Sequence, residues 1–141
     1  MIANFNNVDV VNGIAAGTKK NDIFNIKPTD TNVTVTASKG SDILLLNEVT
    51  VDDIKNLSFV QNTNASNTTK DLVITTSNNR IVLLDYFTTT NANATKSSVK
   101  TIRIENGTDE NGNMLYKDFN IVDLCKIDYI GTFTPKKNKV T

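Results

Sequence analysis

Residues 37–46 read ASKGSDILLL, and the second half of this stretch decides the fold class. DILLL (42–46) is a short apolar run behind one acid, which is expected for a strand buried on both faces. A similar flexible stretch precedes DIFNI (22–26) in AGTKKNDIFN (16–25). Each stretch places an Asp after small or polar residues and an apolar residue two positions later. Such stretches are either degenerate calcium-binding turns or polar loops that lead into strands.

Short strand signals recur along the chain. Val, Ile and Thr favour strands, and Asn favours the turns between them. The remaining predicted strands are NVTVTA (32–37), LSFV (57–60), DLVITT (71–76), RIVLLDYF (80–87), VKTIRIE (99–105), MLYKDF (114–119) and DYIGTFT (128–134). Many short strands separated by turn signals predict an all-β fold.

Helix signals are scarce, and turn signals are frequent. TVDDIKNL (50–57) predicts one or two helical turns, because Thr50 and Asp53 have the spacing of a capping box. GTDENGN (107–113) contains an Asn-Gly step typical of hairpin turns and predicts a hairpin tip. The sequence therefore predicts very little helix.

Length and charge limit the function classes. At 141 residues, the chain is long enough for one domain with its own core. Fifteen basic and fifteen acidic residues give zero formal net charge, which argues against nucleic acid or an anionic membrane as the main partner. No apolar run is long enough for a membrane span, and MIANFNNVDVV lacks the pattern of a cleavable signal.

The residue inventory also restricts catalysis and metal binding. There is no histidine, and Cys125 is the only cysteine, so a zinc site or an internal disulfide is not expected. A Ser or Cys nucleophile would have no histidine to activate it. Asp52 and Asp53 are adjacent and would point in different directions, which favours a role at a helix start over an acid–base pair. We therefore expect no enzyme activity.

Calcium remains a candidate because carboxylate, carbonyl and amide oxygens are the ligands it prefers. The nonapeptide G-G-x-G-x-D-x-U-x winds a parallel β-roll in which the glycines form turns and the apolar U packs inside. Aligned on Asp22, this pattern finds Gly17 and Phe24 in place, whereas Thr18 and Lys20 occupy glycine positions.

The second copy of the pattern is also incomplete. Aligned on Asp42, it finds Gly40 and Leu44 in place, with Ala37 and Ser38 at the first two glycine positions. The candidate calcium ligands from both copies are Asp22, Asp42, Asn21 and the carbonyls of Gly17 and Gly40. The alternative is a calcium-free structural turn that keeps only the shape of the repeat.

Five further segments resemble, in order, the region that follows nonapeptide repeats in RTX, or haemolysin-type, secreted proteins. They are Asp42–Leu46, Val49–Ile54, Asp71–Ile74, Asp85–Phe87 and Ile102–Gly107. The chain departs from that pattern at Glu105-Asn106-Gly107, where Asp-Gly is usual, and in the Asn/Thr-rich insertion at 61–70. The resemblance implies a β-roll end followed by a cap, type I secretion without an N-terminal signal, and calcium-assisted folding outside the cell.

The expected architecture is a single β domain over 1–141. Degenerate parallel β-roll or β-helix turns (13–47) would precede a cap of short, largely antiparallel strands (48–107) and a C-terminal hairpin and tail (108–141). The expected function is a non-catalytic module at the bacterial cell surface or outside the cell. Its partners would be other domains of a larger secreted protein or copies of itself.

Two alternative functions stay open. Zero net charge and Val/Thr-rich strands also suit a self-assembling surface-layer or filament subunit. The polar stretches 61–70 and 88–98 could instead serve an adhesin-type module that binds carbohydrate or protein. Tyr86, Tyr116 and Tyr129, without any tryptophan, would make a poor aromatic platform for sugars.

Overall fold

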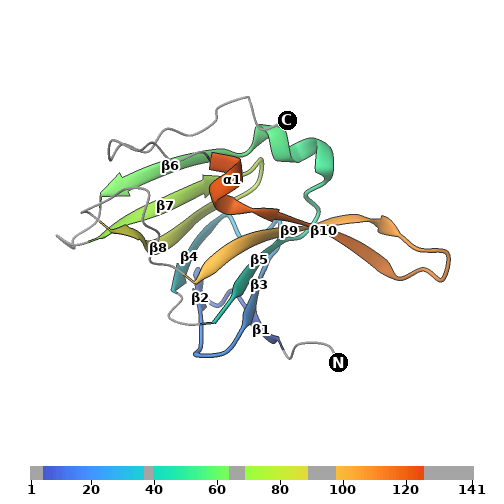
Figure 1. Cartoon of the computed structure of the whole chain (residues 1–141), viewed down its shortest axis with the longest axis horizontal. Coiled ribbons are helices and arrows are strands. Elements are labelled where there is room, and N and C mark those ends of the chain that lie inside the picture. Colours follow the sequence, from blue (N-terminus) through green and yellow to red (C-terminus); the bar gives the residue numbers. More distant parts are fainter. Residues whose placement is uncertain (1–4, 37–39, 64–68, 89–97, 126–141) are drawn as a thin grey trace.

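Two five-stranded β-sheets make up most of the described chain (Figure 1). The computed structural model describes residues 5–36, 40–63, 69–88 and 98–125. Within these ranges, helix is limited to the 3-10 helix η1 (Val51–Asn56) and the α-helix α1 (Ile121–Cys125). The all-β class and the low helix content expected from the sequence are therefore confirmed.

Each sheet draws its strands from both halves of the chain. The first sheet has the order β1 (Asn6–Asp9), β3 (Asp22–Ile26), β5 (Asp42–Leu46), β9 (Val99–Thr108), β10 (Met114–Asn120). The second has the order β2 (Ile14–Ala16), β4 (Asn32–Thr36), β8 (Arg80–Thr88), β7 (Thr69–Thr75), β6 (Ser58–Thr63).

The N-terminal strands alternate between the two sheets. From β1 to β5 each strand lies in the sheet opposite to its predecessor, and neighbours within a sheet run parallel. Ile23 pairs with Ile43 and Ile14 pairs with Thr34, each twenty positions apart, whereas Asn6 pairs with Asp22 sixteen positions later. One coil therefore supplies one strand to each sheet.

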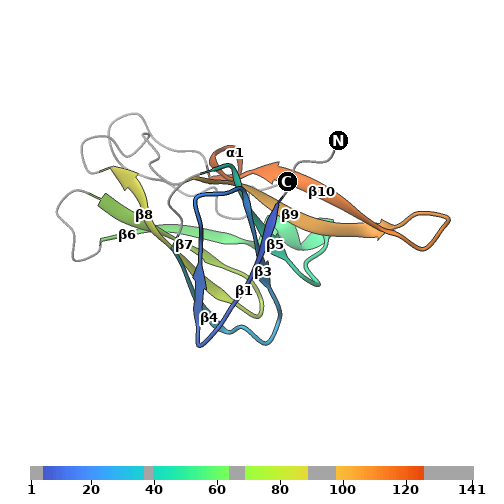
Figure 2. The ribbon, with the colours of Figure 1, turned by 90° about the horizontal axis from the view of Figure 1, so that it is seen from below.

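On the C-terminal side, β8 and β9 join the sheets parallel to β4 and β5, and the strands beyond them are antiparallel. The segment η1–β6–β7 is inserted between β5 and β8, and β6, β7 and β8 pair antiparallel. β9 and β10 form a hairpin that projects from the body of the molecule (Figures 1 and 2). Its tip coincides with the predicted turn at 107–113.

The core lies between the sheets and follows from strand periodicity. In NVTVT, Val33 and Val35 are buried and the threonines point away from the core. In DILLL, Leu44 and Leu46 are completely buried on the inner face, while Ile43 on the other face is only 6% exposed. The expectation that this strand is covered on both faces holds at Ile43 and more weakly at Leu45, which is partly exposed.

Most of the predicted strands are present, and the N-terminus adds two. The observed strands DIFNI and DILLL have the same first and last residues as the predicted strands. The prediction missed β1 and β2, because NNVD is mostly polar and IAA is very short. The predicted strand 128–134 and the centres of the polar stretches (64–68 and 89–97) lie outside the described residues. Across the described ranges, no helix has the length and apolar character needed to cross a membrane.

Candidate metal-binding turns

A row of polar side chains crosses the first sheet where its parallel strands begin. Asn6 pairs with Asp22 between β1 and β3, and Asp42 of β5 pairs with Val99 of β9. Ser98 lies immediately before β9. Asp22 and Asp42 are 0% and 1% exposed, so both of the predicted acidic ligands are buried. Charged groups at such positions require partners.

Asp22 receives hydrogen bonds at both carboxylate oxygens. The backbone N–H of Thr18 donates to Oδ2 at 2.7 Å, and the Thr18 hydroxyl donates to Oδ1 at 2.8 Å. The Asn6 amide donates to the same Oδ1 from the neighbouring strand at 3.1 Å. The N–H of Lys20 donates to the Thr18 hydroxyl oxygen at 3.0 Å, which orients that hydroxyl toward Asp22.

Asp42 receives donors from the strands on both sides of it. The backbone N–H of Asp22 donates to Oδ1 at 2.8 Å, and the Ser98 hydroxyl donates to Oδ2. Burial raises the pKa of Asp42 above its usual range, and the negative charge of Asp22 acts in the same direction. The bonds from Ser98 and from the Asp22 amide oppose this rise in pKa, since they stabilise the carboxylate.

The turn before Asp42 packs against the equivalent turn of the preceding coil. Gly40 has a φ of +93°, and a Cβ at this position would lie 2.5 Å from the carbonyl oxygen of Lys20. The Asn21 side-chain oxygen accepts the Ser41 N–H at 2.9 Å. Gly17 instead follows β2, where its N–H donates to the Thr36 carbonyl of the second sheet. The structure therefore brings Asp22, Asp42, Asn21 and Gly40 together, whereas the backbone of Gly17 is bonded to the other sheet.

The described hydrogen bonds use the carboxylate oxygens that a calcium ion would need. All four carboxylate oxygens of Asp22 and Asp42 accept at least one N–H or O–H donor, so an ion would compete with these donors for the oxygens. Among the residues that the structure describes, no three acidic or cysteine side chains gather in a way that could hold a metal. Calcium binding stays a prediction, and the hydrogen bonds favour the alternative of a calcium-free structural turn.

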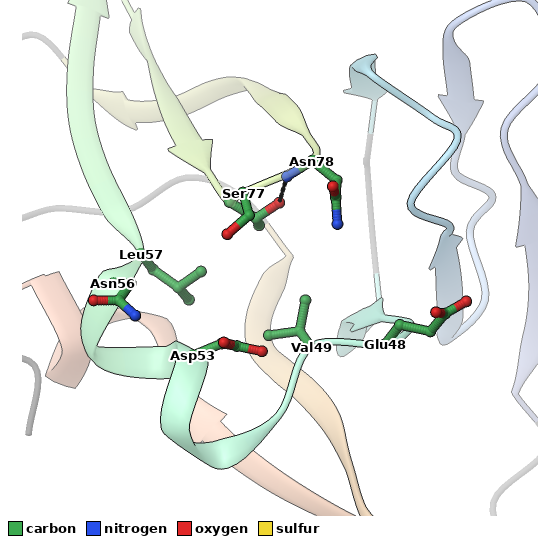
Figure 3. Close-up of a pocket in the computed structure, with 8 residues that line it drawn as sticks. Glu48, Val49, Asp53, Asn56, Leu57, Ser77 and Asn78 are labelled. Carbon is green, nitrogen blue, oxygen red and sulfur yellow. Dashed lines mark hydrogen bonds between the residues drawn. The ribbon is translucent and has the colours of Figure 1, made fainter.

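A small hollow of about 50 Å³ lies elsewhere, between the end of β5, η1 and the β7–β8 turn (Figure 3). Val49 and Leu57 face each other across it, and the Glu48 carboxylate points away from the other labelled side chains (Figure 3). The Asp53 carboxylate accepts the Thr50 N–H at 2.9 Å, which is one half of the predicted capping box, and it also accepts the Thr50 hydroxyl at 3.0 Å. The carboxylate of Asp53 therefore has a structural partner at the start of η1.

Asp71–Ile74 and Asp85–Phe87, two of the RTX-like segments, contact each other in the second sheet. The sequence analysis did not predict this contact. Asp71 of DLVITT is 7% exposed, and its carboxylate accepts the N–H of Asp85 at 2.9 Å. Asp85 has a φ of +55° beside a shift in the register of β7 and β8. This bulge allows the consecutive residues Tyr86 and Phe87 both to point into the core.

Asn79 is a second buried polar residue that the sequence analysis missed. Its side-chain nitrogen donates to the carbonyls of Lys27 and Asp30, both at 2.8 Å, and its oxygen accepts the Thr76 hydroxyl at 2.7 Å. It thereby fastens the β7–β8 turn to the β3–β4 turn. An Asn in an Asn-rich chain carries no signal for this role, because its partners are about fifty residues away.

Comparisons with protein-family models, with curated proteins and with solved structures found no match to this chain.

Proposed function

We propose that this chain is a non-catalytic structural module of a larger extracellular protein and that it terminates a stack of parallel coils. The alternation of β1 to β5 between two sheets is the observation that carries this proposal. The antiparallel strands β6, β7 and β10 lie at the opposite ends of the same sheets. At one end of each sheet the strands are parallel, as in a stack of repeats. At the other end they are antiparallel, as proposed for a cap.

The use of the acidic side chains supports a structural role. Five acidic side chains accept hydrogen bonds from within the protein, so their positions are accounted for without a substrate. They are Asp22, Asp42, Asp53, Asp71 and, in the hairpin tip, Asp109. A catalytic carboxylate would need an accessible oxygen near a reacting group. These five carboxylates instead stabilise turns, a helix cap and a bulge.

The RTX-like order of segments supports an extracellular setting and type I secretion. Asp71–Ile74 and Asp85–Phe87 contact each other, and Asp42–Leu46 pairs with the strand that contains Ile102–Gly107. Segments that resemble one family pattern are thus in contact or paired with each other in the fold. The proposed partners are repeat coils on the N-terminal side, which would pair with the edges of β1 and β2.

A fusion experiment tests the capping role. Consensus G-G-x-G-x-D-x-U-x repeats are placed before residue 1 of the full chain, and their folding is followed by circular dichroism as calcium is added. We expect the repeats to fold at a lower calcium concentration than the same repeats alone, because β1 and β2 provide parallel edges on which the last coil can form.

The control fusion carries Leu44→Asp, which places a charge at a completely buried core position. In this variant, the fused repeats should fold at the same calcium concentration as the repeats alone. Equal midpoints for the wild-type fusion and the Leu44→Asp fusion would contradict the capping role.

Self-assembly is the second candidate, and the β9–β10 hairpin favours it. β10 is an edge strand among those described, and Met114, Leu115 and Tyr116 are 39%, 44% and 49% exposed on it. Edge strands with exposed apolar side chains can pair between molecules. Sedimentation velocity over a concentration series should then show association that Leu115→Lys abolishes. A monomer at every concentration would exclude this candidate.

A further inference from the structure

We propose that hydrogen bonds within the protein replace a divalent cation at the Asp22 and Asp42 turns, so that this end of the stack is held together without calcium. The inference concerns these two turns alone and does not depend on the proposed capping role. It rests on the identity and direction of the groups around the two buried carboxylates.

Thr18 departs from the repeat pattern and binds Asp22. Thr18 occupies a glycine position, and it supplies two of the three donors that reach Asp22 from the described residues. A glycine would retain the backbone donor but would have no hydroxyl. Lys20 occupies another glycine position, and its N–H fixes the orientation of the Thr18 hydroxyl. The Thr18 hydroxyl, which a glycine would lack, therefore adds a hydrogen bond to Asp22, whereas the N–H groups of Thr18 and Lys20 would be present in glycine as well.

Neighbouring segments of the first sheet also donate to the two carboxylates. Asn6 donates to Asp22 from β1, and Ser98 donates to Asp42 from the start of β9. The Asp22 N–H joins the two turns directly by donating to Asp42. An ion shared between coils would link successive turns through their carboxylates. In this chain, side-chain and backbone donors make the same links from one coil to the next.

A cation would have to compete with these donors for the carboxylate oxygens. Each oxygen of Asp22 and Asp42 already accepts at least one donor, and both side chains are almost completely buried. An ion that approached along the directions these donors use would have to break hydrogen bonds to a buried carboxylate, which is unfavourable. The close packing of Gly40 on the Lys20 carbonyl also restricts movement of the turn backbone.

Thermal unfolding of the full chain tests the proposal. We expect the melting midpoint in about 1 mM EDTA to agree with that in about 10 mM calcium chloride to within about 1 °C. Magnesium chloride at the same concentration controls for ionic strength. Thr18→Val removes the hydroxyl donor but keeps the shape and the backbone N–H. It should lower the midpoint by roughly 5 °C, equally with and without calcium.

Thr75→Val is the matched control, since Thr75 is exposed on β7 and the change suits a strand. It should leave the midpoint close to that of the wild type. If Thr18→Val does not fold, Ser98→Ala removes the donor to Asp42 and provides the same comparison. A calcium-specific rise of about 5 °C or more in the wild type, lost in Asp42→Asn, would overturn the proposal. A Thr18→Val variant that melts like the wild type would also overturn it.

Discussion

Gly40 shows how a single residue limits the packing of two coils. Its positive φ places it in a region where side chains other than that of glycine are strained. Its Cα also approaches the carbonyl of Lys20 so closely that the added carbon of alanine would overlap backbone atoms. The one glycine of the ASKG turn that matches the repeat pattern is therefore required by backbone shape, without reference to a bound ion.

Substitution of Gly40 separates conformational strain from overlap. Gly40→Ala should lower the free energy of unfolding by about 2–4 kcal/mol, because strain and overlap act together. Gly107→Ala is the control, since Gly107 has a φ of +81° but no atom lies within 4 Å of the place that an added Cβ would take. That change should cost about 1 kcal/mol from strain alone. Equal losses in urea denaturation would contradict the role of the Lys20 contact.

The bulge in β8 is the clearest departure from regular strand geometry within an element. Regular alternation would send one of two consecutive residues to the surface. Instead, Tyr86 and Phe87 are both buried, and their rings meet edge to face with centroids 5.0 Å apart. Asp71 stabilises the backbone at Asp85 that makes this possible. The polar residue on β7 thus determines how the aromatic residues of β8 pack.

Variants at Asp71 test this control of the bulge. Asp71→Ala removes the acceptor for the Asp85 N–H and should lower the free energy of unfolding by about 1–3 kcal/mol. Asp71→Asn keeps a side-chain oxygen in the same place and should retain most of the stability. Amide hydrogen exchange at Asp85 should be faster in the alanine variant than in the asparagine variant. The same exchange rate in both variants would mean that the carboxylate does not hold the bulge.

At the scale of the whole molecule, buried polar groups connect parts that are distant in sequence. The Tyr86 hydroxyl of the second sheet donates to the Val99 carbonyl of the first at 2.9 Å. Asn79 joins two turns, and the Asp22–Asp42 row joins successive strands. These links tie the parallel coils to the antiparallel strands around one hydrophobic core. The two parts are therefore expected to unfold together in the full chain.

Much of the fold could be predicted from local patterns, because strand periodicity and turn chemistry act over a few residues. DIFNI, DILLL and NVTVT carry their own alternation or apolar character, and the 107–113 turn carries its Asn-Gly step. β1 and β2 were missed because their short sequences carry neither signal. Their pairing with β3 and β4 supplies the stability that their own composition does not indicate.

The sequence by itself determined the strand-rich class, the positions of the central strands and the candidate acids Asp22 and Asp42. Only the tertiary structure decided what surrounds those acids. Asn6 and Ser98 reach them from positions 16 and 56 residues away, so no local pattern could have identified these donors. The spacing of a motif indicates where a carboxylate lies along the chain, but its partners depend on which strands close the core around it.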